Sequence, residues 1–422
     1  MAGCAKDDCK TSYTYTMYTP VYMSYHELRN SVASTSPRDL ENPGKIYVFG
    51  SYLFINEVNE GIHVIDNSDP HNPTFVSFIE IPGNIDMAVN GNYLYADSYV
   101  DLVVLDISNP SSAQEVGREL NMFPNYTINS YQTHPDSGVI VDYDEELVTE
   151  VYDGPCDGSG PIFYPVIDVG GGIFVDFDVV SGGRPMTTNG LTSGNEGVRN
   201  VGPSGQGGSM ARFTLSQGRL YTVNETSLNV VSISSPTDPV PGQTVNLGWG
   251  IETIFPYSDK LFVGAMDGMH ILDVSSPDNP VHISSYNHIT SCDPVVVDGN
   301  YAYVTLRSGT QCQGFTNQLD LVDISDIYNP SLVKSWNMNN PHGLGLDTDL
   351  LFLCDGDDGL KIFNNQNPLQ VGDNQVFHYT NIQSYDVIPF NNVLMMIGED
   401  GLFQYDYSDP SNIYKISEIR VN

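Results

Sequence analysis

Basic residues are scarce in this chain of 422 residues: there are 16 Lys plus Arg against 52 Asp plus Glu, for a formal net charge of -36. A surface this anionic repels phosphate backbones, so we expect no nucleic-acid partner. Apolar runs of the ~20 residues that a membrane-spanning helix needs are also lacking. The charge instead favours an exposed, well-solvated face or one that attracts divalent cations.

Cysteine is rare as well, and its spacing does not fit a zinc site. The six cysteines include no Cys-x-x-Cys pair. We expect a disulfide between Cys292 and Cys312, because both fall at the same end of one predicted sheet. A second pair between Cys156 and Cys354 is a guess, and Cys9 is left over.

Tyrosine, glycine and proline are abundant, with 26, 39 and 26 copies, which favours strands and turns over helices. The stretch "LVVLDISNP" at 102–110 recurs as "MHILDVSSP" at 269–277 and "LDLVDISDIYNP" at 319–330. A second apolar motif, seen as "YLF" at 52 and "YLY" at 93, marks a unit of about 41 residues that occurs seven times. Each unit contains four strand-like segments. A turn with Gly or Asp joins the second to the third, and Pro follows the third and ends it.

Four short antiparallel strands repeated seven times predict an all-β, seven-bladed β-propeller. We expect the propeller to span 45–422, after a tether at 1–44, with a large loop insertion at 124–208 after the second blade. Within it, "SGVIVDYDEELVTEVYD" predicts one long strand or a hairpin, and the Gly-rich remainder predicts loop on the top face, where the sheets are joined to one another. In the tether, "YHELRNSV" predicts a helical turn, and "TYTMYTPVY" could add a strand to a blade edge.

The segments "LVVLDISNP", "LVDIS" and "ILDVSSP" resemble the repeat of LVIVD-repeat propeller proteins, many of which are bacterial surface lipoproteins. The resemblance covers almost the whole chain from Lys45 onward, and it implies a propeller and a surface address but no established activity.

The beginning of the chain, "MAGCAKDDCK", looks like the end of a lipoprotein signal, with cleavage before Cys4 and lipid attached to its thiol. The "AKDD" that follows resembles the tag that exports some Gram-negative lipoproteins to the cell surface. We therefore expect a lipid-anchored location on the outer membrane, with Met1 in place of a removed leader. The alternative is a polar N-terminus with no targeting role.

One polar or ionisable residue stands seven or eight positions before each repeat anchor, where the innermost strand of each blade begins. We call this set the channel-mouth ring; it comprises Lys45, Asp86, Arg212, Glu252, Asp293, His342 and Asp386. Its acids Asp86, Glu252, Asp293 and Asp386 could bind Ca²⁺ or perform acid–base chemistry. Because Lys45 and Arg212 carry the opposite charge, the alternative is a solvated or ion-paired ring.

Three functions remain open. The first is a non-enzymatic interaction or scaffold module that binds an outer-membrane protein or surface assembly. The second is a propeller hydrolase, such as a lactonase-like enzyme, with a divalent cation at the channel mouth. The third is a glycan-binding accessory protein. No Gly-x-Ser-x-Gly nucleophile motif occurs, which favours the first function, and no catalytic residue can be named.

"DGDDG" at 355–359 predicts a hairpin turn rather than a calcium loop, and His63, His270 and His282 are expected in packing or surface roles.

Overall fold

The computed structural model describes residues 8–123, 133–134, 136–155, 174–176, 205–288, 294–309 and 316–422. The chain divides into two compact units. The first comprises 1–30 and 125–189, and the second comprises 31–124 and 190–422. This division differs from the predicted tether at 1–44, because the N-terminal strand forms a unit with part of the insertion.

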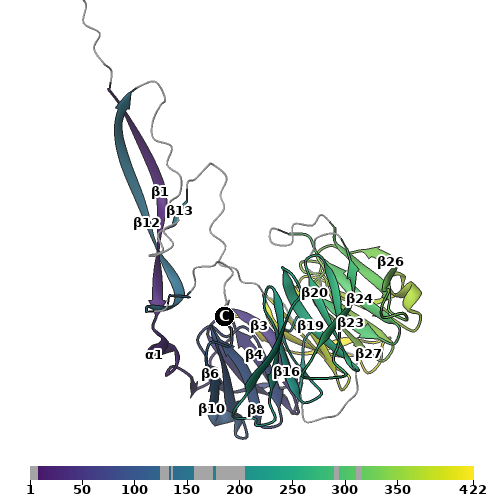
Figure 1. The fold of residues 1–422 in the computed structure, drawn as a ribbon. Helices are drawn as coiled ribbons and strands as arrows, with labels where there is room; N and C mark the ends of the chain where they lie inside the picture. Colours follow the sequence, from purple (N-terminus) through teal and green to yellow (C-terminus); the bar gives the residue numbers. More distant parts are fainter. Residues whose placement is uncertain are drawn as a thin grey trace, which may run out of the picture. The chain divides into compact units, whose positions relative to one another are not determined.

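The second unit is the predicted all-β, seven-bladed propeller, whose blades follow one another in chain order (Figure 1). Each blade contains a four-stranded antiparallel meander, and the sheet of blade 1 has one further short strand at each edge. The innermost strands are β3 (Pro43–Phe49), β7 (Met87–Asn90), β15 (Phe213–Ser216), β19 (Ile251–Tyr257), β23 (Val295–Asp298), β27 (Leu344–Asp347) and β31 (Asp386–Phe390). The second strands are β4 (Tyr52–Glu57), β8 (Tyr93–Ser98), β16 (Arg219–Val223), β20 (Lys260–Ala265), β24 (Tyr301–Leu306), β28 (Leu350–Cys354) and β32 (Val393–Gly398).

The copied apolar segment forms the third strand of each blade. These strands are β5 (Gly61–Asp66), β9 (Asp101–Asp106), β17 (Ser227–Ser232), β21 (Gly268–Asp273), β25 (Gln318–Asp323), β29 (Leu360–Asn364) and β33 (Gly401–Asp406). The outer strands are β6 (Thr74–Glu80), β10 (Gln114–Glu119), β18 (Val240–Asn246), β22 (Val281–Asn287), β26 (Ser331–Asn337), β30 (Gln375–Tyr379) and β34 (Tyr414–Arg420). In blade 2, Leu102–Leu105 are fully buried on both faces of β9, whereas β10 is half-buried or exposed. Both faces of a blade are therefore buried by packing against the neighbouring blades, which a single sheet could not achieve alone.

The aspartate that ends the copied strand shapes the turn that follows it. Its carboxylate oxygen accepts a hydrogen bond from the backbone N–H two residues later, as from Ser108 to Asp106 at 2.8 Å. The same contact recurs in the pairs Asp66–Ser68, Asp273–Ser275, Asp323–Ser325 and Asp406–Ser408. This Asx turn explains why Asp and Ser are copied together with the strand.

The ring closes without a blade shared between the two chain ends, because β3–β6 and β31–β34 are each contiguous. Apolar residues of blades 1 and 7 pack together instead, among them Ile46 against Ile388 and Met395. The side-chain amides of Asn67 and Gln404 exchange two hydrogen bonds of 2.9 and 2.8 Å. Asn422 also donates from its backbone N–H to the carbonyl of Leu40.

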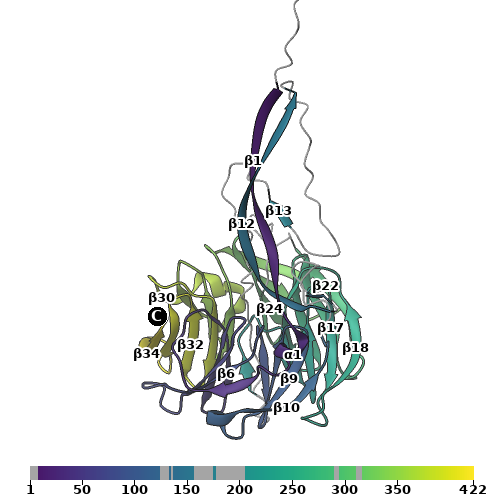
Figure 2. The same ribbon diagram turned by 90° about the vertical axis from the view of Figure 1, so that its left-hand side faces the viewer.

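The first unit contains a long antiparallel ribbon of β1 (Asp8–Met23) and β12 (Gly138–Pro155). Figures 1 and 2 show this ribbon and the short strand β13 (Phe174–Asp176), which pairs with β1. The segment at 14–22 therefore adds its strand to the insertion rather than to a blade edge, and the insertion supplies one long strand. The helical turn appears as α1 (Tyr25–Leu28), which a capping box of Ser24 and Glu27 begins.

Cys354 is a free and fully buried thiol in β28, so the guessed pair with Cys156 is wrong. Burial raises its pKa well above the ordinary value of a thiol. The predicted Cys292–Cys312 disulfide involves two residues outside the described part of the chain. No helix in the described part is long and apolar enough to cross a membrane.

Candidate functional site

Six of the seven residues of the channel-mouth ring are described, and each lies at or next to the start of an innermost strand. Lys45, Asp86 and Asp386 are almost completely buried, and His342 is 8% exposed. Arg212 and Glu252 are half-buried, and Asp293 lies outside the described residues. The ring positions are therefore more enclosed than the solvated mouth considered as the alternative.

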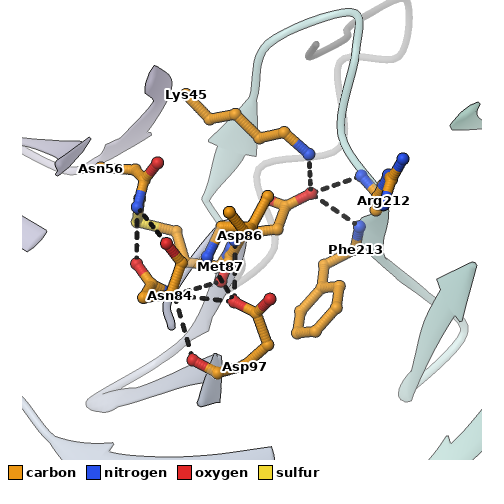
Figure 3. Close-up of polar contacts among 9 residues, drawn as sticks. Lys45, Asn56, Asn84, Asp86, Met87, Asp97, Arg212 and Phe213 are labelled. Carbon is orange, nitrogen blue, oxygen red and sulfur yellow. Dashed lines mark hydrogen bonds and ion pairs between the residues drawn. The ribbon is translucent and has the colours of Figure 1, made fainter. Parts of the chain in front are cut away.

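Asp86 is the centre of the best-defined part of this site (Figure 3). Its Oδ2 atom forms a 2.7 Å ion pair with Nζ of Lys45 and accepts hydrogen bonds from the backbone N–H groups of Arg212 and Phe213. Three donors thus surround one carboxylate oxygen and join blades 1, 2 and 3. Burial lowers the pKa of Lys45, and the nearby Asp86 carboxylate opposes that shift.

A second carboxylate lies directly beneath this pair. Oδ1 of Asp97, on β8, accepts hydrogen bonds from the backbone N–H groups of Ile85 and Asp86 and from Nδ2 of Asn84, at 2.8–2.9 Å. Nδ2 of Asn56 in turn donates to Oδ1 of Asn84 at 2.8 Å (Figure 3). Burial raises the pKa of Asp97 to about 6, although the hydrogen bonds from the backbone favour its ionised form.

The other side of the ring combines Glu252, Arg307 and His342. Arg307 follows β24 and carries a charge that acts on both other residues. Burial raises the pKa of Glu252, and Arg212 and Arg307 oppose this shift. Burial and the positive charge of Arg307 lower the pKa of His342 well below its usual value, so this imidazole is neutral at pH 7. Arg307 therefore acts electrostatically on both an acid and a histidine of the ring.

The channel itself is lined by a segment that the sequence placed in the surface insertion. We define residues 205–212 as the channel segment. Within it, β14 (Gln206–Gly207) adds to the inner edge of β3, with Gln206 opposite Val48 and Gly207 opposite Tyr47. The predicted top-face loop at 124–208 is thus wrong for its last residues, which lie along the innermost strand of blade 1.

Hydrogen bonds connect the channel segment to six blades, including blade 3, where the N–H of Val223 donates to the carbonyl of Arg212. In blade 1, Ile46 accepts from the N–H of Gly208. In blade 2, Val89 accepts from the N–H of Gly205 and Asp86 accepts from that of Arg212. In blades 4, 6 and 7 the partners are the N–H of Ile254, the N–H of Leu344 and the carboxylate of Asp386.

Glycine is required where the channel segment meets blade 7. A Cβ atom on Gly208 would lie 1.7 Å from Oδ2 of Asp386. On the facing strand, a Cβ atom on Gly343 would lie 2.2 Å from Oδ1 of the same carboxylate. Next to these glycines, Ser209 donates its N–H to Asp386 at 3.2 Å and accepts from the N–H of Leu344 at 2.6 Å.

The contacts of the described acids do not favour a shared calcium site, and Asp293, the fourth acid of that prediction, lies outside the described residues. In the described residues, no group of three or more His, Cys, Asp or Glu side chains could hold a metal ion. Ca²⁺ requires six to eight oxygen ligands, whereas Asp86 faces an ammonium group and two backbone N–H donors. The described acids Asp86, Glu252 and Asp386 are separate parts of a polar network rather than a shared ligand set.

The "DGDDG" segment at 355–359 is a turn between β28 and β29, as predicted. Asp355 is fully buried and accepts hydrogen bonds from the backbone N–H groups of Asn339 and Asn340. Nζ of Lys361 lies 2.5 Å from carboxylate oxygens of both Asp355 and Asp358. Donors from the protein therefore occupy this carboxylate too.

Sequence reasoning missed Asn56, Asn84, Asp97 and Arg307, because they come from second strands and connections rather than from the starts of innermost strands. A signal for the channel segment was present in the glycines at 205, 207 and 208, which permit close backbone approach. Nothing in the sequence indicated which strand that segment would join.

Comparison with known proteins supports the repeat assignment. The LVIVD repeat matches residues 43–79, 84–120, 259–288 and 291–338. These ranges cover blades 1 and 2, most of blade 4 and blade 5. No curated protein matches the chain.

Solved structures agree on the fold alone. A computationally designed protein, Ika8, is 9% identical, with a TM-score of 0.51 over 91% of this chain and 90% of its own. BamB from Moraxella catarrhalis is 10% identical, with a TM-score of 0.47 over 88% and 84% of the two chains. Hsv2 from Kluyveromyces lactis is 10% identical, with a TM-score of 0.47 over 90% of this chain and 100% of its own.

Proposed function

Because this chain is a seven-bladed β-propeller that carries LVIVD repeats, we propose that it is a lipid-anchored cell-surface protein whose role is to bind another protein. In this proposal it is a non-enzymatic interaction module of the outer membrane, and its partner is an outer-membrane protein or surface assembly. A fold alone does not define a function, so the support has to come from the particular surfaces of this chain.

The central channel supports a binding role over a catalytic one. The channel segment runs along β3, and its ends contact Val89 and Asp86, which lie at opposite ends of the innermost strand of blade 2. Met210 and Ser209 of this segment are buried. A channel filled in this way offers little room for a substrate at the ionisable residues. The outer surfaces of the blades and the ribbon are then the surfaces left for recognition.

The ribbon is the observation that carries the proposal. A strand of 16 residues spans about 50 Å. The ribbon is widened by the short strands β11 (Thr133–His134) and β13 alone among the described residues, and a ribbon of two strands is at best marginally stable in water by itself. Leu147 and Val151 on β12 are 70% and 60% exposed. Four exposed acids, Asp142, Asp144, Glu145 and Glu146, lie on the same strand. A long ribbon with exposed apolar and acidic side chains is suited to binding a partner along its length.

The membrane anchor is part of the same proposal. β1 begins at Asp8, four positions after Cys4. A lipid on Cys4 would place the beginning of the ribbon beside the bilayer. The "AKDD" that follows Cys4 supports transfer to the outer face of the outer membrane.

Photo-crosslinking in the native host tests the binding role. A photoreactive phenylalanine analogue is placed at Leu147 on the ribbon and, as a matched control, at Val240, which is 54% exposed at the beginning of β18. We expect one discrete adduct of constant mass from position 147 and none from position 240. Absence of an adduct at position 147, or equal adducts at both positions, would contradict a partner on the ribbon.

Location requires a separate measurement. We expect the wild-type chain to incorporate labelled palmitate and to be digested when intact cells are treated with protease. The Cys4→Ser variant should take up no label and should leave the membrane fraction. A wild-type protein that stays unlabelled and protected from protease would refute the surface anchor but would leave the crosslinking result intact.

A further inference from the structure

Two histidines and a serine meet on the outer strands of blade 4. His270 lies on β21, and His282 and Ser285 lie on β22. In the strand register, His270 is opposite Ser285 and Leu272 is opposite His282, with a bulge between Ile271 and Leu272. The bulge brings His282 toward the same place as the His270–Ser285 pair.

The two imidazole rings direct one nitrogen each at the same atom. Nδ1 of His270 and Nε2 of His282 both lie 2.9 Å from Oγ of Ser285. The ring centroids are 5.3 Å apart, with an angle of 70° between the ring planes. In imidazole each nitrogen lies roughly 1 Å from the ring centroid, so the two nitrogens that point at Ser285 are closer together than the two centroids. One metal ion with bonds of ~2.0–2.1 Å to each nitrogen can bridge such a pair.

We propose that His270 and His282 form a binding site for a borderline transition-metal ion of the Zn²⁺ or Cu²⁺ class. Two imidazole nitrogens supply the protein ligands, and water or the Ser285 hydroxyl completes the coordination sphere. Nitrogen donors select these ions over Ca²⁺ and Mg²⁺, which require oxygen ligands.

The carboxylate of Asp267 lies near the second ring nitrogen of His270. Oδ1 of Asp267 lies 3.6 Å from Nε2 of His270. That nitrogen is buried and has no hydrogen-bond partner among the described residues. Metal binding at Nδ1 requires the proton to be on Nε2, and the negative charge of Asp267 favours this tautomer.

The surroundings of the two rings also suit a metal site. His270 is 8% exposed, and its position is fixed by the sheet, whereas His282 is exposed and open to ions from solvent. The net charge of -36 further raises the local concentration of cations near the surface.

The competing explanation is a purely structural chain of hydrogen bonds. In that case the Ser285 hydroxyl donates to one imidazole and accepts from the other, and the trio is satisfied without a metal. The two explanations differ in whether the full chain binds Zn²⁺ or Cu²⁺ at these histidines, so a metal titration distinguishes them.

The test is isothermal titration of the metal-free full chain with ZnCl₂ and with CuCl₂, in the presence of excess CaCl₂. We expect one site of uniform affinity in the wild-type protein. His270→Ala and His282→Ala should each weaken it at least tenfold, and Asp267→Asn should weaken it less than either of them. Since His282 is exposed, its substitution leaves the fold intact.

His71→Ala is the matched control, because His71 is exposed and lies beside Asp69 as His270 lies beside Asp267. It should leave the site unchanged. A wild-type chain that binds neither metal would overturn the proposal. Variants at 270 and 282 that titrate like the wild type would overturn it as well.

Discussion

Replacing Asp97 with Asn should make the propeller more stable at neutral pH. Asp97 is 3% exposed, and burial raises its pKa from 3.8 to about 6. An acid whose pKa is higher in the folded state than in the unfolded state stabilises the fold only while it is protonated. Its contribution is therefore complete below pH 3.8 and is lost as the pH rises through about 6.

The magnitude follows from the size of the shift. One pKa unit corresponds to about 1.36 kcal/mol, so a shift of roughly two units costs the ionised wild type up to about 3 kcal/mol at pH 7. The Asn side chain keeps an oxygen that can accept from Asn84, Ile85 and Asp86, and it removes the buried charge. We therefore expect the gain in the free energy of unfolding to be near zero at pH 4 and to approach 3 kcal/mol above pH 7.

Urea unfolding from pH 4 to pH 8, followed by tryptophan fluorescence, measures this difference. Asp238→Asn is the control, because Asp238 is exposed and its loss changes the net charge by the same amount. The control should show a small difference that varies little with pH. A gain for Asp97→Asn that does not depend on pH, or a loss at pH 7, would refute the argument that burial dominates at this carboxylate.

Three further perturbations test the polar site, the channel segment and the buried thiol of β28. Asp86→Ala leaves Lys45 buried without its partner, and loss of one member of a buried pair should cost about 3–5 kcal/mol in urea unfolding; an effect below 1 kcal/mol would contradict the central role of this carboxylate. Gly208→Ala should cost about 1–3 kcal/mol, because its Cβ would lie 1.7 Å from Asp386, and a neutral result would mean that the channel segment is placed differently. Cys354 should react with iodoacetamide only after unfolding, because it is fully buried; peptide mass spectrometry that finds it alkylated in the native protein would contradict that burial.

The repeat could be predicted because a propeller uses each strand in the same way in every blade. Asp106 and its counterparts were copied with the strand because each makes the same Asx turn. The segment at 137–153 was predicted to form one long strand or a hairpin, and the structure has the single strand β12 there. Local patterns of this kind depend on neighbours along the chain, and a sequence displays them directly.

The partners of segments distant in the sequence could not be predicted in this way. β1 pairs with β12 more than a hundred positions later, and β14 pairs with β3. Neither segment belongs to the repeat, so no second copy shows where it fits. The positions of the channel-mouth ring followed from register, but the interactions of Asp86 depend on Lys45 and on the channel segment, which arrive from different blades.

The channel segment also bears on how the ring is held closed. Blades 1 and 7 are each built from one contiguous stretch, so no strand of one chain end completes a blade of the other. Side-chain packing, the Asn67–Gln404 amide pair, hydrogen bonds from Gln404 and Ser417 to the carbonyl of Pro70, and the contact of Asn422 with Leu40 join them directly. The channel segment adds a second connection across the same junction, because it pairs with β3 of blade 1 while Ser209 binds Asp386 of blade 7. Contacts with blades 2, 4 and 6 extend this connection around the ring. Asp86 and Asp386 accept hydrogen bonds from this glycine-rich segment and fix it along the innermost strands, so loss of either carboxylate should destabilise the whole propeller rather than one blade.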